Sequence, residues 1–167
     1  MFEYWDLYDE NKNKLDKVVK RGDKLNDNEY HLVVNVWIKN ENNRYLISQR
    51  SENKKHPLLW ECTGGSAIKN ESSIDAAIRE AKEELGIELN KLEGKLIGSK
   101  RRYYPGCPDI LDAWIFKYND ISTSEIKIQK EEVNDVKWAS VEEIRKLYVE
   151  NKFESNDFFE EALRYEI

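Results

Sequence analysis

The chain has 167 residues, of which 40% are apolar and 11% aromatic, and these fractions favour a folded globular protein over a disordered one. Its formal net charge is −6, which makes nucleic acid a poor partner. No stretch approaches the roughly 18 apolar residues of a membrane span, and the N-terminus has no signal-peptide pattern. We therefore expect one cytoplasmic domain over residues 1–167 that binds neither nucleic acid nor membrane.

The predicted elements begin with an N-terminal extension over residues 1–29, which contains a strand at 2–8 and a hairpin partner around Val18 and Val19. Cys62 and Cys107 are isolated, so two free thiols are expected rather than a disulfide or a zinc knuckle. Further strands are predicted over residues 31–38, 45–47, 60–63, 95–103, 110–118 and 133–138, and the first two of these resemble a hairpin.

Helices are predicted from Ser72 or Ser73 to Leu85, with Gly86 as the C-terminal stop, and from a capping box at Ser140 to about residue 150. A last helix fits residues 155–164. Strands outnumber helices and do not alternate with them as in a doubly wound sheet. The predicted class is α+β, with a mixed sheet packed between helices.

Three glutamates, Glu80, Glu83 and Glu84, lie in one five-residue stretch inside the first predicted helix. At about 100° per residue they share an arc of about 100° on which no cation lies, and like charges there repel by a few tenths of a kcal/mol per pair. Divalent cations such as Mg²⁺ prefer carboxylate oxygens, so the arc is a candidate metal site, with a solvated helix face as the alternative. The opposite stripe, predicted to be buried, consists of Ile74, Ala77, Ile78, Ala81 and Leu85.

Gly64 and Gly65 come shortly before this helix. Glycine permits a close backbone approach or a positive φ, and a main-chain carbonyl left free there could face the same ion. A purely structural turn is the alternative.

The spacing of these residues follows a longer pattern. Gly65 is followed after five residues by Glu71, after seven more by Arg79-Glu80-Ala81, and after one more by Glu83-Glu84, with Gly86-Ile87 closing the segment. Residues 64–87 therefore resemble the Nudix box. The resemblance implies a Nudix-like mixed β-sheet sandwiched between α-helices, with the box as a loop–helix–loop. It also implies hydrolysis of a diphosphate bond in a small molecule, a nucleoside diphosphate linked to another group X.

The resemblance further implies a site. Glu80, Glu83 and Glu84, with the main-chain carbonyl of Gly64, would bind Mg²⁺ or Mn²⁺. Glu71 and Arg79 complete the catalytic set as residues that orient these glutamates. Relatives are often dimers, so a homodimer is among the expected assemblies.

Segments outside the box resemble Nudix proteins related to isopentenyl-diphosphate isomerase: residues 3–10, 31–34 and 49–51. Isomerases of this type need a cysteine followed two residues later by a histidine, where this chain has Gly64 and Ser66. Cys62 is two positions away, about 6–7 Å along a strand. His31 matches an isomerase metal ligand, with a strand-start residue as the other interpretation. Isomerase activity and non-catalytic nucleotide binding remain as alternatives.

The general base and the substrate contacts are less specific in the sequence. The base is a box glutamate or a later acid, the candidates being Glu125, Glu131, Glu132, Asp109 and Asp112. The predicted substrate-binding residues are Arg50, Lys54, Arg101, Arg102 and Tyr104, for which an ordinary solvated surface is the alternative. Neither group X nor the natural substrate follows from the sequence.

Overall fold

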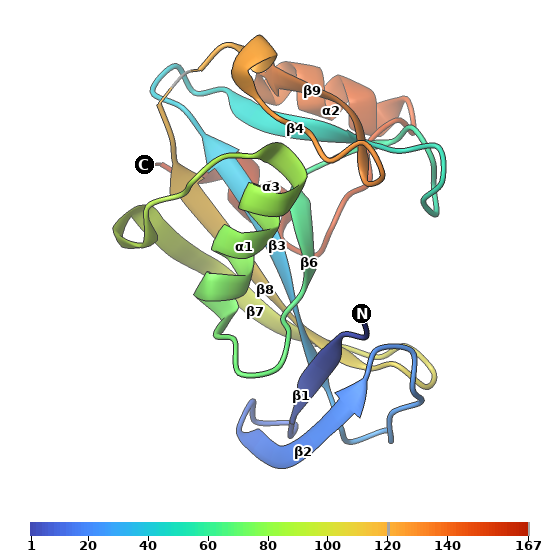
Figure 1. The fold of residues 1–167 in the computed structure, drawn as a ribbon. Helices are drawn as coiled ribbons and strands as arrows, with labels where there is room; N and C mark the ends of the chain where they lie inside the picture. Colours follow the sequence, from blue (N-terminus) through green and yellow to red (C-terminus); the bar gives the residue numbers. More distant parts are fainter. Residues whose placement is uncertain (120, 167) are drawn as a thin grey trace.

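The computed structural model describes residues 1–119 and 121–166, and a seven-stranded mixed β-sheet forms its centre (Figure 1). Its strands are β3 (His31–Lys39), β4 (Tyr45–Arg50), β5 (Trp60–Glu61), β6 (Thr63–Ser66), β7 (Gly94–Arg102), β8 (Asp109–Lys117) and β9 (Val133–Ala139). Strand β3 pairs in parallel with β8 along its whole length and antiparallel with β6 from Val33 to Val36. Strand β7 pairs antiparallel with β8, and β4 pairs antiparallel with β5 and β9.

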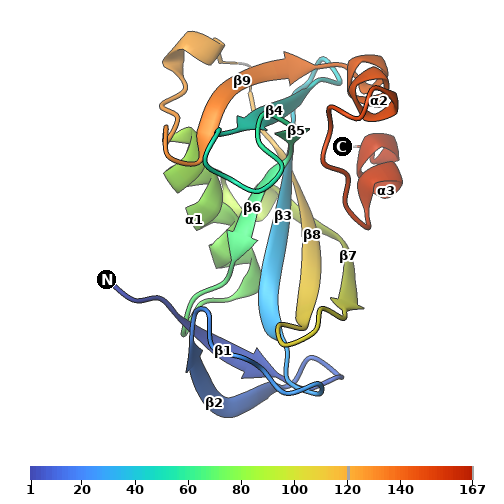
Figure 2. The same cartoon turned by 90° about the vertical axis from the view of Figure 1, so that its right-hand side faces the viewer.

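Helices cover both faces of this sheet (Figures 1 and 2). Helix α1 (Ser73–Leu85) lies on one face, and α2 (Val141–Val149) and α3 (Phe159–Arg164) lie on the other. Because side chains alternate along a strand, β3 sends Val34 and Val36 to the α1 side and Trp37 to the side of α2 and α3, so that two separate cores form. The predicted α+β class, with a mixed sheet between helices, is confirmed.

The N-terminal extension forms its own two-stranded sheet, β1 (Tyr4–Tyr8) with β2 (Lys14–Lys20), at one end of the main sheet (Figure 1). Val18 and Val19 of β2 pair with β1, as predicted. We call residues 2–21, which comprise β1, β2, their connection and the flanking residues Phe2, Glu3 and Arg21, the N-terminal hairpin. A small core of Trp5, Leu7 and Leu25 lies beneath it.

Three polar contacts fix the N-terminal hairpin to the loop before α1 and to the main sheet. The carboxylate of Asp6 accepts a hydrogen bond from the Asn70 amide at 2.7 Å, and the carbonyl of Tyr4 accepts one from the Lys69 amide at 2.8 Å. Lys12 Nζ lies 2.6 Å from both carboxylate oxygens of Asp112 in β8. The hairpin is thus attached directly to the segment that carries the box.

Several local predictions need correction. The predicted helix over residues 155–164 begins only at Phe159, because Asn156 Oδ1 accepts from the Phe158 amide and turns the chain instead. The hairpin predicted for 31–38 and 45–47 is found, since β3 and β4 pair antiparallel at Lys39 and Tyr45, while residues Val33 to Val36 of β3 pair with β6. The predicted strand at 60–63 is two strands, and Gly64 and Gly65 lie inside the second.

Two 3₁₀ helices, η1 (Lys91–Glu93) and η2 (Thr123–Glu125), were not predicted. Cys62 and Cys107 are free thiols, as expected. None of the helices in residues 1–119 and 121–166 has the length and apolar character needed to cross a lipid bilayer.

Candidate active site

The ends of helix α1 are set by the residues that the sequence indicates. The side chain of Ser72 accepts a hydrogen bond from the Asp75 amide at 3.3 Å, and Gly86 ends the helix with φ of 65°, a left-handed conformation that suits glycine. These two residues fix the length of the helix. The glutamates at 80, 83 and 84 therefore lie in its last two turns.

Part of the acidic arc of α1 is packed against strand β6: Glu80 and Glu84 are shielded from solvent, whereas the Glu83 side chain is 53% exposed. Ala76 on this arc is fully buried, and Glu84 is only 5% exposed. Thr63 Oγ1 donates a hydrogen bond to the Glu84 carboxylate. The Glu80 carboxylate lies where a Cβ on Gly65 would stand, and Gly65 has no positive φ. Of the two uses predicted for the double glycine, close approach is the one found here.

The prediction that no cation offsets the repulsion among the glutamates of this arc is wrong. Arg79 Nη1 lies 2.8 Å from Glu80 Oε1 and 3.0 Å from Glu83 Oε2. Its Nε and Nη2 donate to the two oxygens of Glu71 at 2.8 and 3.0 Å, and Nη2 also donates to the Ser66 carbonyl at 3.0 Å. A helical wheel gives only Cβ directions, whereas a long arginine side chain reaches neighbours one and four residues away.

Lys54 is a second cation beside the cluster. Its Nζ lies 2.8 Å from Glu132 Oε2, 3.7 Å from Glu84 Oε1 and 3.8 Å from Glu61 Oε1. Arg50 Nη1 lies 2.6 Å from Glu61 Oε2. The main-chain amide of Gln129 donates a hydrogen bond to the main-chain carbonyl of Glu84 at 2.9 Å. The loop that carries Glu132 is therefore bonded to the end of α1.

These carboxylates are held in a partly desolvated place. Burial raises the pKa of Glu80 to about 7, although Arg79 works against the shift, and burial also raises the pKa of Glu84. A nearby cation of higher charge would reverse both shifts. In the described residues, no three acidic, histidine or cysteine side chains already converge on one metal position, because Arg79, Thr63 and Lys54 hold the glutamates.

The donor chemistry nevertheless fits a hard divalent cation. Carboxylate oxygens predominate, and the absence of a Cβ at Gly65 leaves room for the carboxylate of Glu80 against the backbone. Gly64 lies on the same strand and lines the same cavity. A bound ion would take over oxygens that now accept hydrogen bonds from Arg79 and Thr63.

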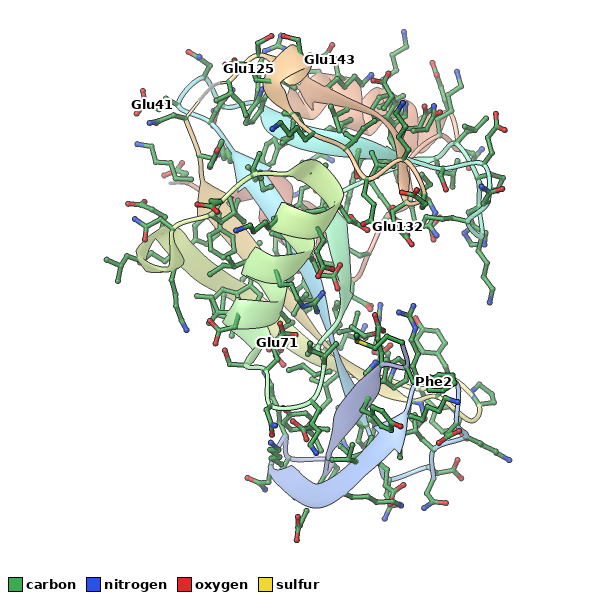
Figure 3. The ribbon with its side chains drawn as sticks, viewed as in Figure 1. Phe2, Glu41, Glu71, Glu125, Glu132 and Glu143 are labelled. Atoms are coloured by element: carbon green, nitrogen blue, oxygen red, sulfur yellow. The ribbon has the colours of Figure 1, made fainter. Side chains whose placement is uncertain are left out.

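A cavity of about 300 Å³ lies beside these residues. It is lined by Glu3, Arg21, Val33, Arg50, Lys54, Gly64, Gly65, Ser66, Glu80, Glu83, Glu84, Gln129 and Glu132. Figure 3 shows Glu71 near the lower end of α1, Phe2 on the N-terminal hairpin and Glu132 above both, on the loop before β9. A larger cavity of about 480 Å³ near Glu41 is lined by none of the predicted site residues.

The predicted substrate contacts separate into two groups. Arg50 and Lys54 line the cavity, whereas Arg101, Arg102 and Tyr104 do not. Arg102 forms two hydrogen bonds with Asp109, at 2.7 and 2.8 Å, and lies over the ring of Tyr104. Arg101 lies 3.7 Å from Glu10. We therefore omit these three residues from the candidate site.

Of the candidate bases outside the box, Glu132 lines the cavity and Glu131 does not. Glu125 accepts from the Ser122 amide as a helix cap, and in Figure 3 it lies well apart from Glu132. Asp109 is paired with Arg102, and Asp112 is buried against Lys12 and Ser73. Sequence reasoning missed Glu3, Arg21, Glu61 and Thr63, since only the tertiary fold brings these to the box.

The residues that would serve an isomerase lie elsewhere. Cys62 packs in the core on the side of α2 and α3, where Asn156 Nδ2 lies 3.4 Å from its sulfur, and burial raises the pKa of its thiol. His31 is buried at the start of β3, stacked on Trp5 with ring centroids 4.0 Å apart. Neither residue lines the cavity of the box glutamates.

Comparison with known proteins agrees with this arrangement. The NUDIX domain matches residues 29–160. An uncharacterized Nudix hydrolase of Listeria monocytogenes is 37% identical over 153 residues, covering 90% of this chain and 88% of that protein. An isopentenyl-diphosphate Delta-isomerase of Escherichia coli is 26% identical over 113 residues, covering 66% of this chain and 62% of that one.

Among solved structures, DR0079 from Deinococcus radiodurans superposes with a TM-score of 0.74 at 20% identity and covers 97% of this chain and 98% of that chain. At that identity the likeness concerns the fold alone. The N-terminal hairpin lies outside the matched residues 29–160, but the box with all its glutamates lies inside them. The chain therefore belongs to the NUDIX domain family and is a Nudix hydrolase, from a family that acts on pyrophosphate bonds in nucleotide-like substrates.

Proposed function

We propose that this enzyme hydrolyses the diphosphate bond of a nucleoside diphosphate linked to another group X, and that it does so with Mg²⁺ or Mn²⁺. One observation carries the proposal: three box glutamates line a cavity of about 300 Å³, and Arg79, itself held by Glu71, donates hydrogen bonds to two of them, Glu80 and Glu83. A cavity of this size accommodates a diphosphate group with part of its substituent.

Glu80, Glu83, Glu84 and the carbonyl of Gly64 are the groups that would hold the ion. A bound divalent ion supplies charge neutralisation of the diphosphate and lowers the pKa of a coordinated water. Lys54 and Arg50 would contact phosphate oxygens once the substrate competes with the carboxylates that now hold them.

Glu132 is the proposed general base. Its carboxylate lines the cavity and lies 2.8 Å from Lys54 Nζ. In this role Glu132 takes a proton from the attacking water, and attack at phosphorus breaks the P–O–P bond. Arg79 acts as a positioning residue because it donates hydrogen bonds to Glu80 and Glu83, and Glu71 supports it by accepting two hydrogen bonds from the same guanidinium.

A substrate panel tests the proposal. CTP, ADP-ribose, UDP-glucose and diadenosine tetraphosphate are each incubated with the enzyme and Mg²⁺ or Mn²⁺, and release of phosphate, pyrophosphate or a mononucleotide is measured. We expect turnover of at least one compound. Isopentenyl diphosphate is assayed in parallel for isomerisation. Turnover of none of the panel would contradict hydrolysis, and isomerisation alone would replace it with the isomerase alternative.

Two further expectations belong with this proposal. A cytoplasmic enzyme is expected, which fractionation of the producing cells tests. A single domain over residues 1–167 and a homodimer are also predictions. Cooperative unfolding in one transition and sedimentation at twice the chain mass are the results that would support them.

A further inference from the structure

The N-terminal hairpin supplies one wall of the candidate active site. Glu3 and Arg21 line the same cavity as Glu80, Glu83 and Glu84, although at least 59 positions in the sequence separate the two groups. They form an ion pair in which Arg21 Nη1 lies 2.6 Å from Glu3 Oε2. The box glutamates and this pair are thus two sides of one opening.

This wall does not depend on the ion pair for its position. Asp6 and Tyr4 are bonded to residues of the loop before α1, and Lys12 is bonded to Asp112 in the main sheet. An exposed pair such as Glu3–Arg21 contributes little to stability. The pair is therefore free to change partners without releasing the hairpin.

Arg21 also differs from the other cations at the cavity. Arg50 and Lys54 have side chains only 16% and 21% exposed, and both are held by acids, Glu61 for one and Glu132 for the other. The side chain of Arg21 is 61% exposed. Within residues 1–119 and 121–166, Glu3 is the one hydrogen-bond acceptor described for its guanidinium. Most of its five donors remain available to a ligand.

We propose that Arg21 is a specificity-determining residue that binds an anionic group X, a phosphate or carboxylate that lies beyond the diphosphate, and that Glu3 is the internal anion displaced when this group arrives. The proposal rests on the diphosphate hydrolysis proposed above, because the box glutamates fix where the diphosphate lies. A planar guanidinium presents paired donors that match the oxygens of either group.

The first test is a binding measurement that needs no turnover. Linear inorganic triphosphate is titrated calorimetrically into the enzyme with Mg²⁺, and ³¹P NMR checks that it stays intact; if it is cleaved, its KM replaces the Kd. Arg21→Ala is expected to weaken binding about tenfold, the loss of one charge-assisted contact. Glu3→Gln is expected to tighten it, because Arg21 loses its competing acceptor. Equal affinity of Arg21→Ala and wild type overturns the proposal.

Lys17→Ala is the matched control. Lys17 is a cation on the same hairpin, paired with Glu29 at 2.6 Å, and it does not line the cavity. This change removes the same charge and should leave triphosphate affinity unchanged. A purely structural Arg21–Glu3 pair predicts effects of the same sign for Arg21→Ala and Glu3→Gln. Opposite signs support the proposal, and the same sign contradicts it.

The second test is kinetic and separates this proposal from the hydrolase proposal. Arg21→Ala is expected to raise KM about tenfold for CTP, whose group X is anionic, and to leave KM for UDP-glucose, whose group X is neutral, within about twofold. Equal effects on both compounds overturn the assignment. If the wild type cleaves neither compound, hydrolysis of these substrates fails, while the triphosphate titration still decides the role of Arg21.

Discussion

The two walls of the cavity are built in opposite ways. On the box wall the charges are interlocked, because Arg79 is bonded to Glu71, Glu80 and Glu83 at once, and of these three acids Glu71 and Glu80 are shielded from solvent while Glu83 is exposed. On the hairpin wall both members of the Glu3–Arg21 pair are exposed, and among the described residues neither side chain has a further hydrogen-bond partner. A buried network fixes directions, whereas an exposed pair exchanges partners easily. The box wall therefore suits one fixed chemistry, and the hairpin wall suits selection among substrates.

Removal of the metal should have the largest effect, and it should act through the box wall. With excess EDTA, hydrolysis of the best panel compound is expected to fall by about 10³-fold or more, because charge neutralisation and an acidified water are lost together. Added Mg²⁺ or Mn²⁺ should restore it. Far-UV circular dichroism should stay unchanged, which separates loss of the ion from unfolding. Full activity in EDTA would contradict a metal-dependent box wall.

Arg79→Ala should differ in kind from Arg21→Ala. It leaves Glu71 and Glu80 buried without their cation, so we expect a loss of about 3 kcal/mol in the free energy of unfolding. We also expect the Mn²⁺ concentration for half-maximal activity to rise about 10- to 100-fold. Urea melts and a metal titration measure the two effects. Arg21→Ala should change neither.

Arg79→Lys sharpens the same comparison. Lysine keeps the charge but cannot form the paired contacts with Glu71, so it should recover stability better than metal affinity. If the two readouts recover together, Arg79 has a structural role only.

The adjacent glycines should separate stability from activity. A Cβ on Gly64 would meet the Val34 carbonyl in the backbone of β3, so Gly64→Ala should destabilise the fold by about 1–3 kcal/mol. The three atoms nearest to a Cβ on Gly65 would all belong to the Glu80 carboxylate, the end of a side chain and not backbone. Gly65→Ala should therefore unfold close to the wild-type urea concentration and lose at least about tenfold in kcat. A reversed pattern would contradict the packing described here.

The N-terminal hairpin should show a smaller effect, a dependence of the free energy of unfolding on pH. Burial lowers the pKa of His31, which stacks on Trp5 beneath the N-terminal hairpin, to about 4 from an ordinary 6.5. The stability that this residue contributes is therefore present in full above pH 6.5 and is lost as the pH falls toward 4, because only the unfolded chain binds the proton. Between pH 7 and 5 we expect a loss of about 1–2 kcal/mol.

Urea melts of wild type and His31→Phe measure this difference, since phenylalanine keeps the ring stack without the titration. Between pH 7 and 5 the wild type should lose about 1–2 kcal/mol more in the free energy of unfolding than His31→Phe loses. His56→Gln, at an exposed histidine, is the control and should follow the wild type at each pH. Parallel curves for wild type and His31→Phe would show that His31 is not buried in its neutral form.

Much of the box wall is predictable from sequence because it is local. Ser72, Gly86 and the three glutamates belong to one helix, and their capping and spacing can be counted along the chain. The fold class also follows, since strand and helix patterns are strong. What a helical wheel misses is the reach of Arg79, which removes the cation-free arc that the wheel predicts.

The hairpin wall could not be predicted in this way. Arg21 meets the box only because Asp6 bonds to Asn70 and Lys12 bonds to Asp112, contacts between segments 64 and 100 residues apart. Likewise, Arg101 and Arg102 are plausible phosphate contacts by charge alone, but the pairing of β7 with β8 places Arg102 beside Asp109. Charge identifies candidates, and only tertiary contacts separate those at the cavity from those elsewhere.

The box glutamates are proposed to bind the divalent ion that supports attack of water on the diphosphate. The most direct test compares wild type, the Glu83→Gln plus Glu84→Gln double variant and Glu88→Gln with Mg²⁺ on the best panel compound. Glu88 is an exposed acid just beyond α1 that pairs with Lys82 and does not line the cavity. The double variant is expected to release product about 10²- to 10³-fold more slowly than wild type, while Glu88→Gln keeps the wild-type rate. Full turnover by the double variant would show that these glutamates do not hold a catalytic ion.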